Sequence, residues 1–148
     1  TGLVTQVLFS PDSQTIVSSS QDGTARLWTL EGEVLHILPG HEAGIWDMAL
    51  SPDGEILATA GRVNNIQLWS VDGKLLRTLV GHNHWVLDLE FSPDGKTLAS
   101  SSRDQTAILW NLEALKFDAL MQRGCDWWRE YTEYQDTPDQ QREICDDV

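Results

Sequence analysis

The sequence is short of basic residues. It contains 10 lysines and arginines against 23 aspartates and glutamates, which gives a formal net charge of −13. Nucleic acids and anionic membrane surfaces are bound by lysines and arginines that face phosphates. We therefore expect the chain to bind neither nucleic acid nor a membrane surface. An apolar run of about 18 residues is also lacking, so we expect no transmembrane helix.

Cysteine is scarce as well. Cys125 and Cys145 are the only two; free thiols in a cytoplasmic protein are the interpretation we favour, and a disulfide between them is the alternative. No histidines and cysteines have the spacing of metal ligands, so we expect no metal site and no cofactor. The chain shows no signal peptide and starts at Thr1 without a methionine, which suggests a piece of a longer protein.

What the sequence does contain is a repeat. Three markers recur at intervals of 41 residues: a tryptophan at positions 28, 69 and 110, Ser-Pro-Asp from positions 10, 51 and 92, and Gly-His from positions 40 and 81. Markers that keep one register predict three structural repeats, near residues 1–30, 40–71 and 81–112.

Each repeat is expected to consist of short β-strands. An apolar run ends at Ser-Pro-Asp, where proline and aspartate favour a turn. A strand of small residues follows, and then a strand that alternates with period two up to the tryptophan. The sequence therefore predicts an all-β fold of three antiparallel four-stranded blades. The expected strands are 3–9, 15–20, 24–30, 33–41, 44–50, 55–60, 65–71, 74–82, 85–91, 97–102 and 106–112.

In combination, these markers resemble the WD-repeat β-propeller family over about three quarters of the chain. The usual Trp-Asp dipeptide is replaced by Trp28-Thr29, Trp69-Ser70 and Trp110-Asn111. The resemblance implies a non-catalytic scaffold or sensor that binds other proteins. It also implies an open arc of three blades, because a propeller typically needs at least about four blades to close a ring, and a leading strand in each repeat that completes the blade before it. One sheet face would then lie bare, to be covered by upstream blades of the same polypeptide or by self-association.

His82, Ser101 and Asp104 have the composition of a hydrolase triad. Nucleophilic catalysis needs an exposed serine and an oxyanion hole, whereas these residues stand in a repeating strand unit without a sharp nucleophile turn. The resemblance implies instead a buried, structural hydrogen-bond chain that includes Trp110. We expect no enzymatic activity from these residues.

The other two copies of this tetrad are incomplete. The first repeat offers Ser19, Asp22 and Trp28. The second offers His41 and Trp69, with alanine and valine at positions 60 and 63, where the serine and the aspartate belong. We therefore expect the second blade to be held by packing more than by the polar chain.

Candidate partner-binding residues lie in the loops on the tetrad side of the blades. Gln21, Arg62 and Arg103 each precede the tetrad-aspartate position, and Trp85 follows a Gly-His pair. Exposed tryptophan and arginine often anchor protein interfaces. The alternative for Trp85 is a strand-start residue packed against the next blade.

Beyond residue 112 the repeat pattern stops. Apolar residues recur at intervals of three and four, which predicts short helices within 117–134 and from 138 to 145. We therefore divide the chain into blades, residues 1–112, and a helical C-terminal cap, residues 113–148. Trp127 and Trp128 are expected to pack on the last blade, with a docking surface as the alternative.

The stretch "GCDWWREY" in this tail resembles the segment after the last WD repeat of large, particularly cyanobacterial, multidomain proteins, some with a NACHT-class ATPase or a protease-like domain. The alternative function is therefore the C-terminal regulatory part of a signalling NTPase or protease. Its catalytic domain would lie upstream, because the phosphate-binding motif GxxxxGK[ST] is absent from this chain. A small stand-alone protein that assembles with its own copies is a third interpretation.

Overall fold

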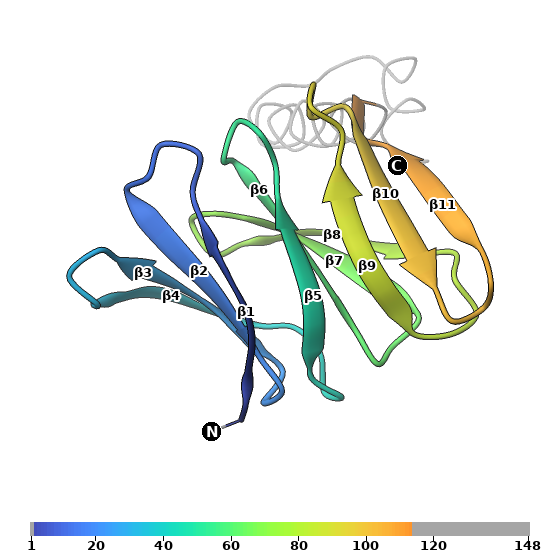
Figure 1. Cartoon of the computed structure of the whole chain (residues 1–148), viewed down its shortest axis with the longest axis horizontal. Coiled ribbons are helices and arrows are strands. Elements are labelled where there is room, and N and C mark those ends of the chain that lie inside the picture. Colours follow the sequence, from blue (N-terminus) through green and yellow to red (C-terminus); the bar gives the residue numbers. More distant parts are fainter. Residues whose placement is uncertain (1, 114–148) are drawn as a thin grey trace, which may run out of the picture. The chain divides into compact units, whose positions relative to one another are not determined.

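The computed structural model describes residues 2–113, which form eleven strands in three separate sheets (Figure 1). The first sheet consists of β1 (Val4–Phe9), β2 (Thr15–Ser20), β3 (Thr24–Thr29) and β4 (Val34–Pro39). The second consists of β5 (Ile45–Leu50), β6 (Ile56–Gly61), β7 (Asn65–Ser70) and β8 (Leu75–Val80). The third consists of β9 (Val86–Phe91), β10 (Thr97–Ser102) and β11 (Ala107–Asn111). Within the described residues, no helix is long and apolar enough to cross a membrane.

The all-β, three-blade prediction is confirmed, and each expected strand is present within a residue or two of its expected ends. The first and second sheets have the four strands expected, whereas the described residues supply three strands of the third sheet, in the order β11-β10-β9. A fourth strand would have to follow Asn111, and no further strand is found up to residue 113. The expected helices, Trp127, Trp128 and both cysteines lie outside the described residues.

The Ser-Pro-Asp turns hold the strand hairpins together. In the first turn, Ser10 Oγ donates to Asp12 Oδ1 at 2.5 Å and accepts the Thr15 N–H at 2.9 Å. The two later copies repeat these bonds. The fourth turn residue has positive φ in all three copies, as glycine in the second and third and as Ser13 in the first (φ 59°). A non-glycine residue is strained in this left-handed region, so the first turn is the least favourable of the three.

Neighbouring sheets pack face to face around buried apolar side chains. Between the first and second sheets, a cluster contains Val17, Leu27, Ile45, Met48 and Trp69 among others. Hydrophobic burial of this kind is the main stabilising contribution in the described region.

Side-chain to backbone hydrogen bonds join the inner strands β1, β5 and β9. The Met48 N–H donates to Gln6 Oε1 at 2.8 Å, and the Leu89 N–H donates to Asp47 Oδ2 at 2.6 Å. Gln6 and Asp47 are 41 residues apart, so the same device is used at both junctions.

One face of the first sheet is bare among the described residues. It carries Val7 and Phe9 of β1 and Ile37 of β4, whose side chains are 54%, 65% and 56% exposed. Trp28 on this face is only half-buried, whereas its repeat equivalent Trp69 is covered by the neighbouring sheet. This arrangement agrees with the bare sheet face expected from the sequence.

Candidate functional site

The tetrad of the third repeat is assembled as a buried hydrogen-bond chain. His82 Nδ1 lies 3.0 Å from Asp104 Oδ2, and His82 Nε2 lies 2.8 Å from Ser100 Oγ. Trp110 Nε1–H donates to the same hydroxyl oxygen at 2.9 Å. These partners assign the tautomer: Nδ1 carries the proton and donates to the carboxylate, and Nε2 accepts the proton of Ser100.

Asp104 is the centre of the turn that follows β10. Its carboxylate accepts hydrogen bonds from the Thr106 hydroxyl, the Asn83 N–H and His82. These donors, with Thr106 first, hold the pKa of Asp104 well below its ordinary value. The carboxylate therefore stays ionised and ties the Gly-His loop to the turn before β11.

The serine in the hydrogen-bonded tetrad is Ser100, so the assignment of Ser101 is wrong by one residue. Alternate residues of a strand point to opposite faces of the sheet. Ser100 shares a face with His82 and Trp110 and is 3% exposed. Ser101 is half-buried, and its backbone pairs with that of Asp88.

The same shift of one residue occurs in the first repeat. Trp28 Nε1–H donates to Ser18 Oγ at 2.9 Å, because the pairing of Trp28 with Ile16 puts Ser18 on its face. Ser19, the predicted residue, instead shares a 2.8 Å hydrogen bond with the Thr5 hydroxyl. Asp22 accepts from the Thr24 hydroxyl at 2.6 Å and from Arg26 at 3.0 Å. The Thr24 hydroxyl, ahead of the other donors, lowers the pKa of Asp22.

The second repeat contains more of the polar chain than the sequence indicated. His41 Nε2 lies 3.1 Å from Thr59 Oγ1, and Trp69 Nε1–H donates to the same oxygen at 3.1 Å. The assignment of Ala60 to the serine position is therefore wrong by one residue, and Thr59 holds that position. Val63 does stand at the aspartate position, so His41 has no carboxylate there, and burial lowers its pKa.

This geometry does not suit nucleophilic catalysis. Ser100 is buried, and its hydroxyl is engaged by both His82 and Trp110. A substrate carbonyl has no access to that oxygen, whereas acyl transfer needs an exposed nucleophile beside an oxyanion hole. A fully satisfied buried polar chain instead fixes the loop conformation around it.

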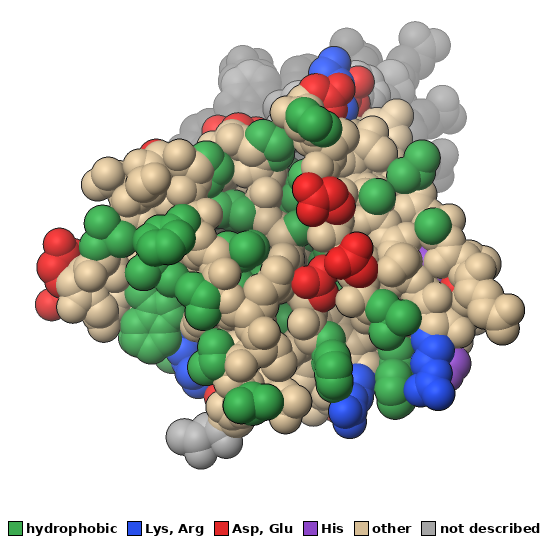
Figure 2. Space-filling view, viewed as in Figure 1, with side chains coloured by type: hydrophobic (Ala, Val, Ile, Leu, Met, Phe, Trp, Pro, Cys, Tyr) green, Lys and Arg blue, Asp and Glu red, His purple; other side chains and the backbone are tan. Residues whose placement is uncertain are grey.

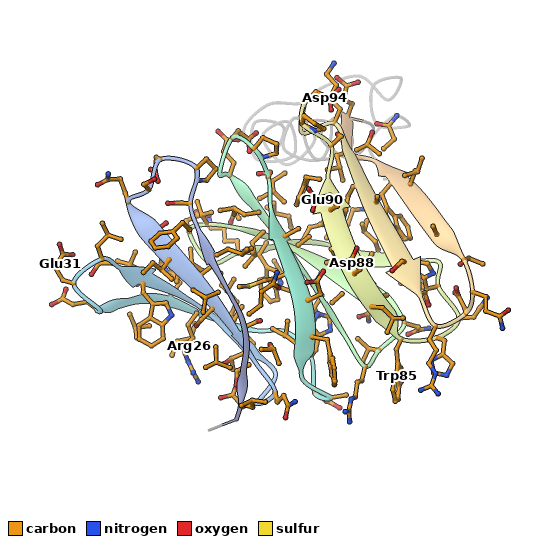
Figure 3. The ribbon with its side chains drawn as sticks, in the orientation of Figure 1. Arg26, Glu31, Trp85, Asp88, Glu90 and Asp94 are labelled. Atoms are coloured by element: carbon orange, nitrogen blue, oxygen red, sulfur yellow. The ribbon has the colours of Figure 1, made fainter. Side chains whose placement is uncertain are left out.

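The candidate partner-binding residues all lie at one end of the sheets. Each sheet is an antiparallel meander, so successive loops alternate between its two ends. The loops with Gln21, Arg62, Arg103 and Trp85 are therefore at the tetrad end, and the Ser-Pro-Asp turns are at the other. Figure 3 shows the two ends: Trp85 is labelled at one and Asp94, from a Ser-Pro-Asp turn, at the other.

Three of these four residues come together, and a fourth residue that the sequence analysis missed joins them. The Arg62 guanidinium carbon lies 4.8 Å from the Trp46 ring centroid and 5.4 Å from that of Trp85. The guanidinium carbon of Arg103 lies 4.9 Å from the Trp85 centroid. We call these four side chains the Arg–Trp stack: Trp46, Arg62, Trp85 and Arg103.

The spacing of the repeats predicted neither the presence of Trp46 in the stack nor the absence of Gln21 from it. Trp46 is offset by two residues from the position equivalent to Trp85, so the spacing gave no signal for it. Gln21 occupies the position equivalent to Arg62 and Arg103 and is exposed, but it is not part of the stack. Its N–H donates to the carbonyl of Leu3 at 2.9 Å.

Backbone hydrogen bonds hold the stack in place. The Arg103 N–H donates to the Trp85 carbonyl at 2.9 Å, and the Val86 N–H donates to the Val63 carbonyl at 3.2 Å. These bonds join the turn after β10 to the start of β9, and the start of β9 to the turn after β6. The stack is therefore built on loops of the second and third sheets whose positions are already set.

Comparisons with known proteins agree with this architecture. Residues 1–29, 32–70 and 73–111 match the family model described as WD40: WD domain, G-beta repeat. The chain is similar to the crystal structure of the WD40 repeats of RRP9, with a TM-score of 0.73 and 31% identity over 76% of this chain and 36% of that chain. It is similar to the structure of U3-55K, with a TM-score of 0.73 and 30% identity over 76% of this chain and 37% of that one. The chain thus spans little more than a third of either structure. No curated protein matches it.

The matched segments also show how the repeat relates to the sheets. The segments 32–70 and 73–111 each begin with an outer strand, β4 or β8, that belongs to the preceding sheet. The expectation that a repeat spans two blades is therefore confirmed.

Proposed function

Since the chain belongs to the WD40 repeat family, whose repeats generally form non-catalytic protein-interaction scaffolds, we propose that it binds a protein partner through the loops at the tetrad end of its blades. The Arg–Trp stack carries this proposal. Tryptophan and arginine are the residue types that most often anchor protein interfaces. Here they are grouped at one end, with Trp46 and both arginines exposed.

The tetrad supports this function by ordering the loops before a partner arrives. His82 and Asp104 connect the loop that leads to Trp85 with the turn that contains Arg103. A contact surface that is already ordered loses less conformational entropy when it binds. In this proposal His82, Ser100 and Asp104 are structural residues and do no chemistry.

The finer assignment is to a larger, cytoplasmic signalling protein. This assignment is supported by the resemblance of the tail to the ends of large multidomain proteins. The alternative function, a regulatory segment for an upstream NTPase or protease, also requires such a larger protein. Sequencing the gene on both sides of this segment tests it. A reading frame that contains only these residues would contradict it.

The contact face is tested by affinity capture with the whole chain as bait. Trp85→Ala is compared with Lys96→Ala, a change in a turn at the opposite end of the same sheet. We expect partners captured by the wild type to be retained by Lys96→Ala and lost by Trp85→Ala. Equal capture by both variants would show that the partner binds elsewhere.

A further inference from the structure

The two ends of the sheets differ in charge. The loops at the Ser-Pro-Asp end, residues 10–14, 30–33, 51–55, 71–74 and 92–96, contain seven acids and two lysines. The loops at the tetrad end, residues 21–23, 40–44, 62–64, 81–85 and 103–106, contain three acids and two arginines. In the space-filling view, lysine and arginine side chains lie beside hydrophobic ones along the edge where Figure 3 places Trp85 (Figures 2 and 3).

Most of the negative charge at the tetrad end is already engaged. The carboxylates of Asp22 and Asp104 accept hydrogen bonds within their own turns. Glu42 is the one other carboxylate in these loops. Asp22 is also paired with Arg26, so the tetrad end is less acidic than the Ser-Pro-Asp end.

The two arginines of the stack have no carboxylate partner within residues 2–113. Arg26, by contrast, pairs with Asp22 at 3.0 Å. A guanidinium that covers a ring with its planar face keeps its N–H donors in the plane of the group, around its edge. Arg62 and Arg103 are both exposed, so these donors are open to a ligand.

We infer that the partner segment that binds the Arg–Trp stack is an acidic peptide, whose aspartate or glutamate carboxylates bind Arg62 and Arg103. The inference rests on the proposed function and names the chemistry of its partner. Arginine binds carboxylates through paired N–H donors. Because the guanidinium carbons of Arg62 and Arg103 lie 5.4 and 4.9 Å from the centroid of one indole ring, they suit a peptide with two nearby acidic residues. The exposed Trp46 adds apolar contact area beside them.

The first step of the test is a selection of random displayed peptides against the immobilised whole chain. The selected peptides are synthesised and their affinities measured by fluorescence anisotropy. Each is paired with a version in which its aspartates and glutamates become asparagine and glutamine. The protein variants are the double change Arg62→Ala with Arg103→Ala, the double change to lysine, and Arg77→Ala as the control. Arg77 is an exposed arginine of β8, outside the loops.

We expect acidic peptides to be enriched. The double alanine variant should bind them roughly 10- to 100-fold more weakly, the effect of losing hydrogen bonds to a charged group. The double lysine variant should bind with intermediate affinity, because lysine keeps the charge but not the planar pairing. Arg77→Ala should bind as the wild type does. Replacing the peptide acids by amides should weaken binding to the wild type and to Arg77→Ala, but not further weaken binding to the double alanine variant.

Other outcomes separate this inference from the proposed function. Selected peptides without acidic enrichment, whose binding still requires Trp85, would overturn the acidic partner and leave the contact face intact. Peptides that bind equally to the wild type, Trp85→Ala and the double alanine variant would overturn both. Equal affinity for a single-stranded oligodeoxynucleotide of the same charge, or binding only after a peptide serine is phosphorylated, would overturn the carboxylate ligand.

Discussion

Ser100→Ala is the substitution that most directly tests the tetrad geometry. In the wild type, the Ser100 hydroxyl accepts a hydrogen bond from Trp110 Nε1–H and donates one to His82 Nε2. Removing it leaves two groups without that partner at a site where His82 and Ser100 are buried. Each unsatisfied buried group costs about 1–3 kcal/mol, so for two such groups we expect a loss of about 2–6 kcal/mol in the free energy of unfolding. This is a large share of the roughly 5–15 kcal/mol that stabilises an ordinary domain.

Ser101→Ala is the matched control, since it also removes a serine hydroxyl, one residue further along β10. The described residues give Ser101 no side-chain hydrogen bond, so we expect a change within about 0.5 kcal/mol. Urea unfolding followed by tryptophan fluorescence and by circular dichroism measures both variants on the whole chain. If Ser101→Ala were as destabilising as Ser100→Ala, the one-residue shift derived from the strand faces would be refuted. An unchanged stability of Ser100→Ala would refute the energetic role of the tetrad.

Three further predictions concern the turn, the second tetrad and the bare face. Ser13→Gly should raise the free energy of unfolding by about 0.5–1 kcal/mol, because glycine adopts the positive φ at residue 13 without steric strain. A thermal melt measures this change, and a lower melting temperature would contradict it. Burial lowers the pKa of His41 from 6.5, so stability should fall as the pH drops below about 6.5, where the unfolded chain takes up the proton first. Val63→Asp should reduce that loss in unfolding experiments at graded pH, whereas an identical pH profile would show that no carboxylate reaches His41. The chain should self-associate through the bare face, and Phe9→Asp should weaken this in size-exclusion chromatography with light scattering; a wild-type monomer at high concentration would refute it.

Much of the fold was predictable because it depends on local sequence. Ser-Pro-Asp turns recur every 41 residues, and each is closed by hydrogen bonds among five or six neighbouring residues. The strand runs between the turns follow period two, a property of the chain itself. Local patterns were enough to place eleven strands. The resemblance to the WD-repeat family related His82, Asp104 and Trp110, which the structure joins with Ser100.

The serine of the tetrad was not predictable from spacing alone. Which of two adjacent serines faces a tryptophan depends on the register between two strands, and a shift of one residue moves a side chain to the opposite face. Trp28 pairs with Ile16, which puts Ser18 on the same face of the sheet as Trp28. Trp69 pairs with Leu57, which puts Thr59 on the same face as Trp69. Neither pairing can be read from the distance between markers.

The sequence by itself determined the strands, the turns and the order of the repeats, because neighbouring residues encode these through φ preferences and alternating polarity. Only the tertiary structure decided which side chains meet between sheets. Trp46 and Arg62 lie in the second repeat and Trp85 in the third, and they stack because two sheets pack side by side. Contacts across a sheet junction depend on how whole faces pack, and no local pattern in a single strand specifies them.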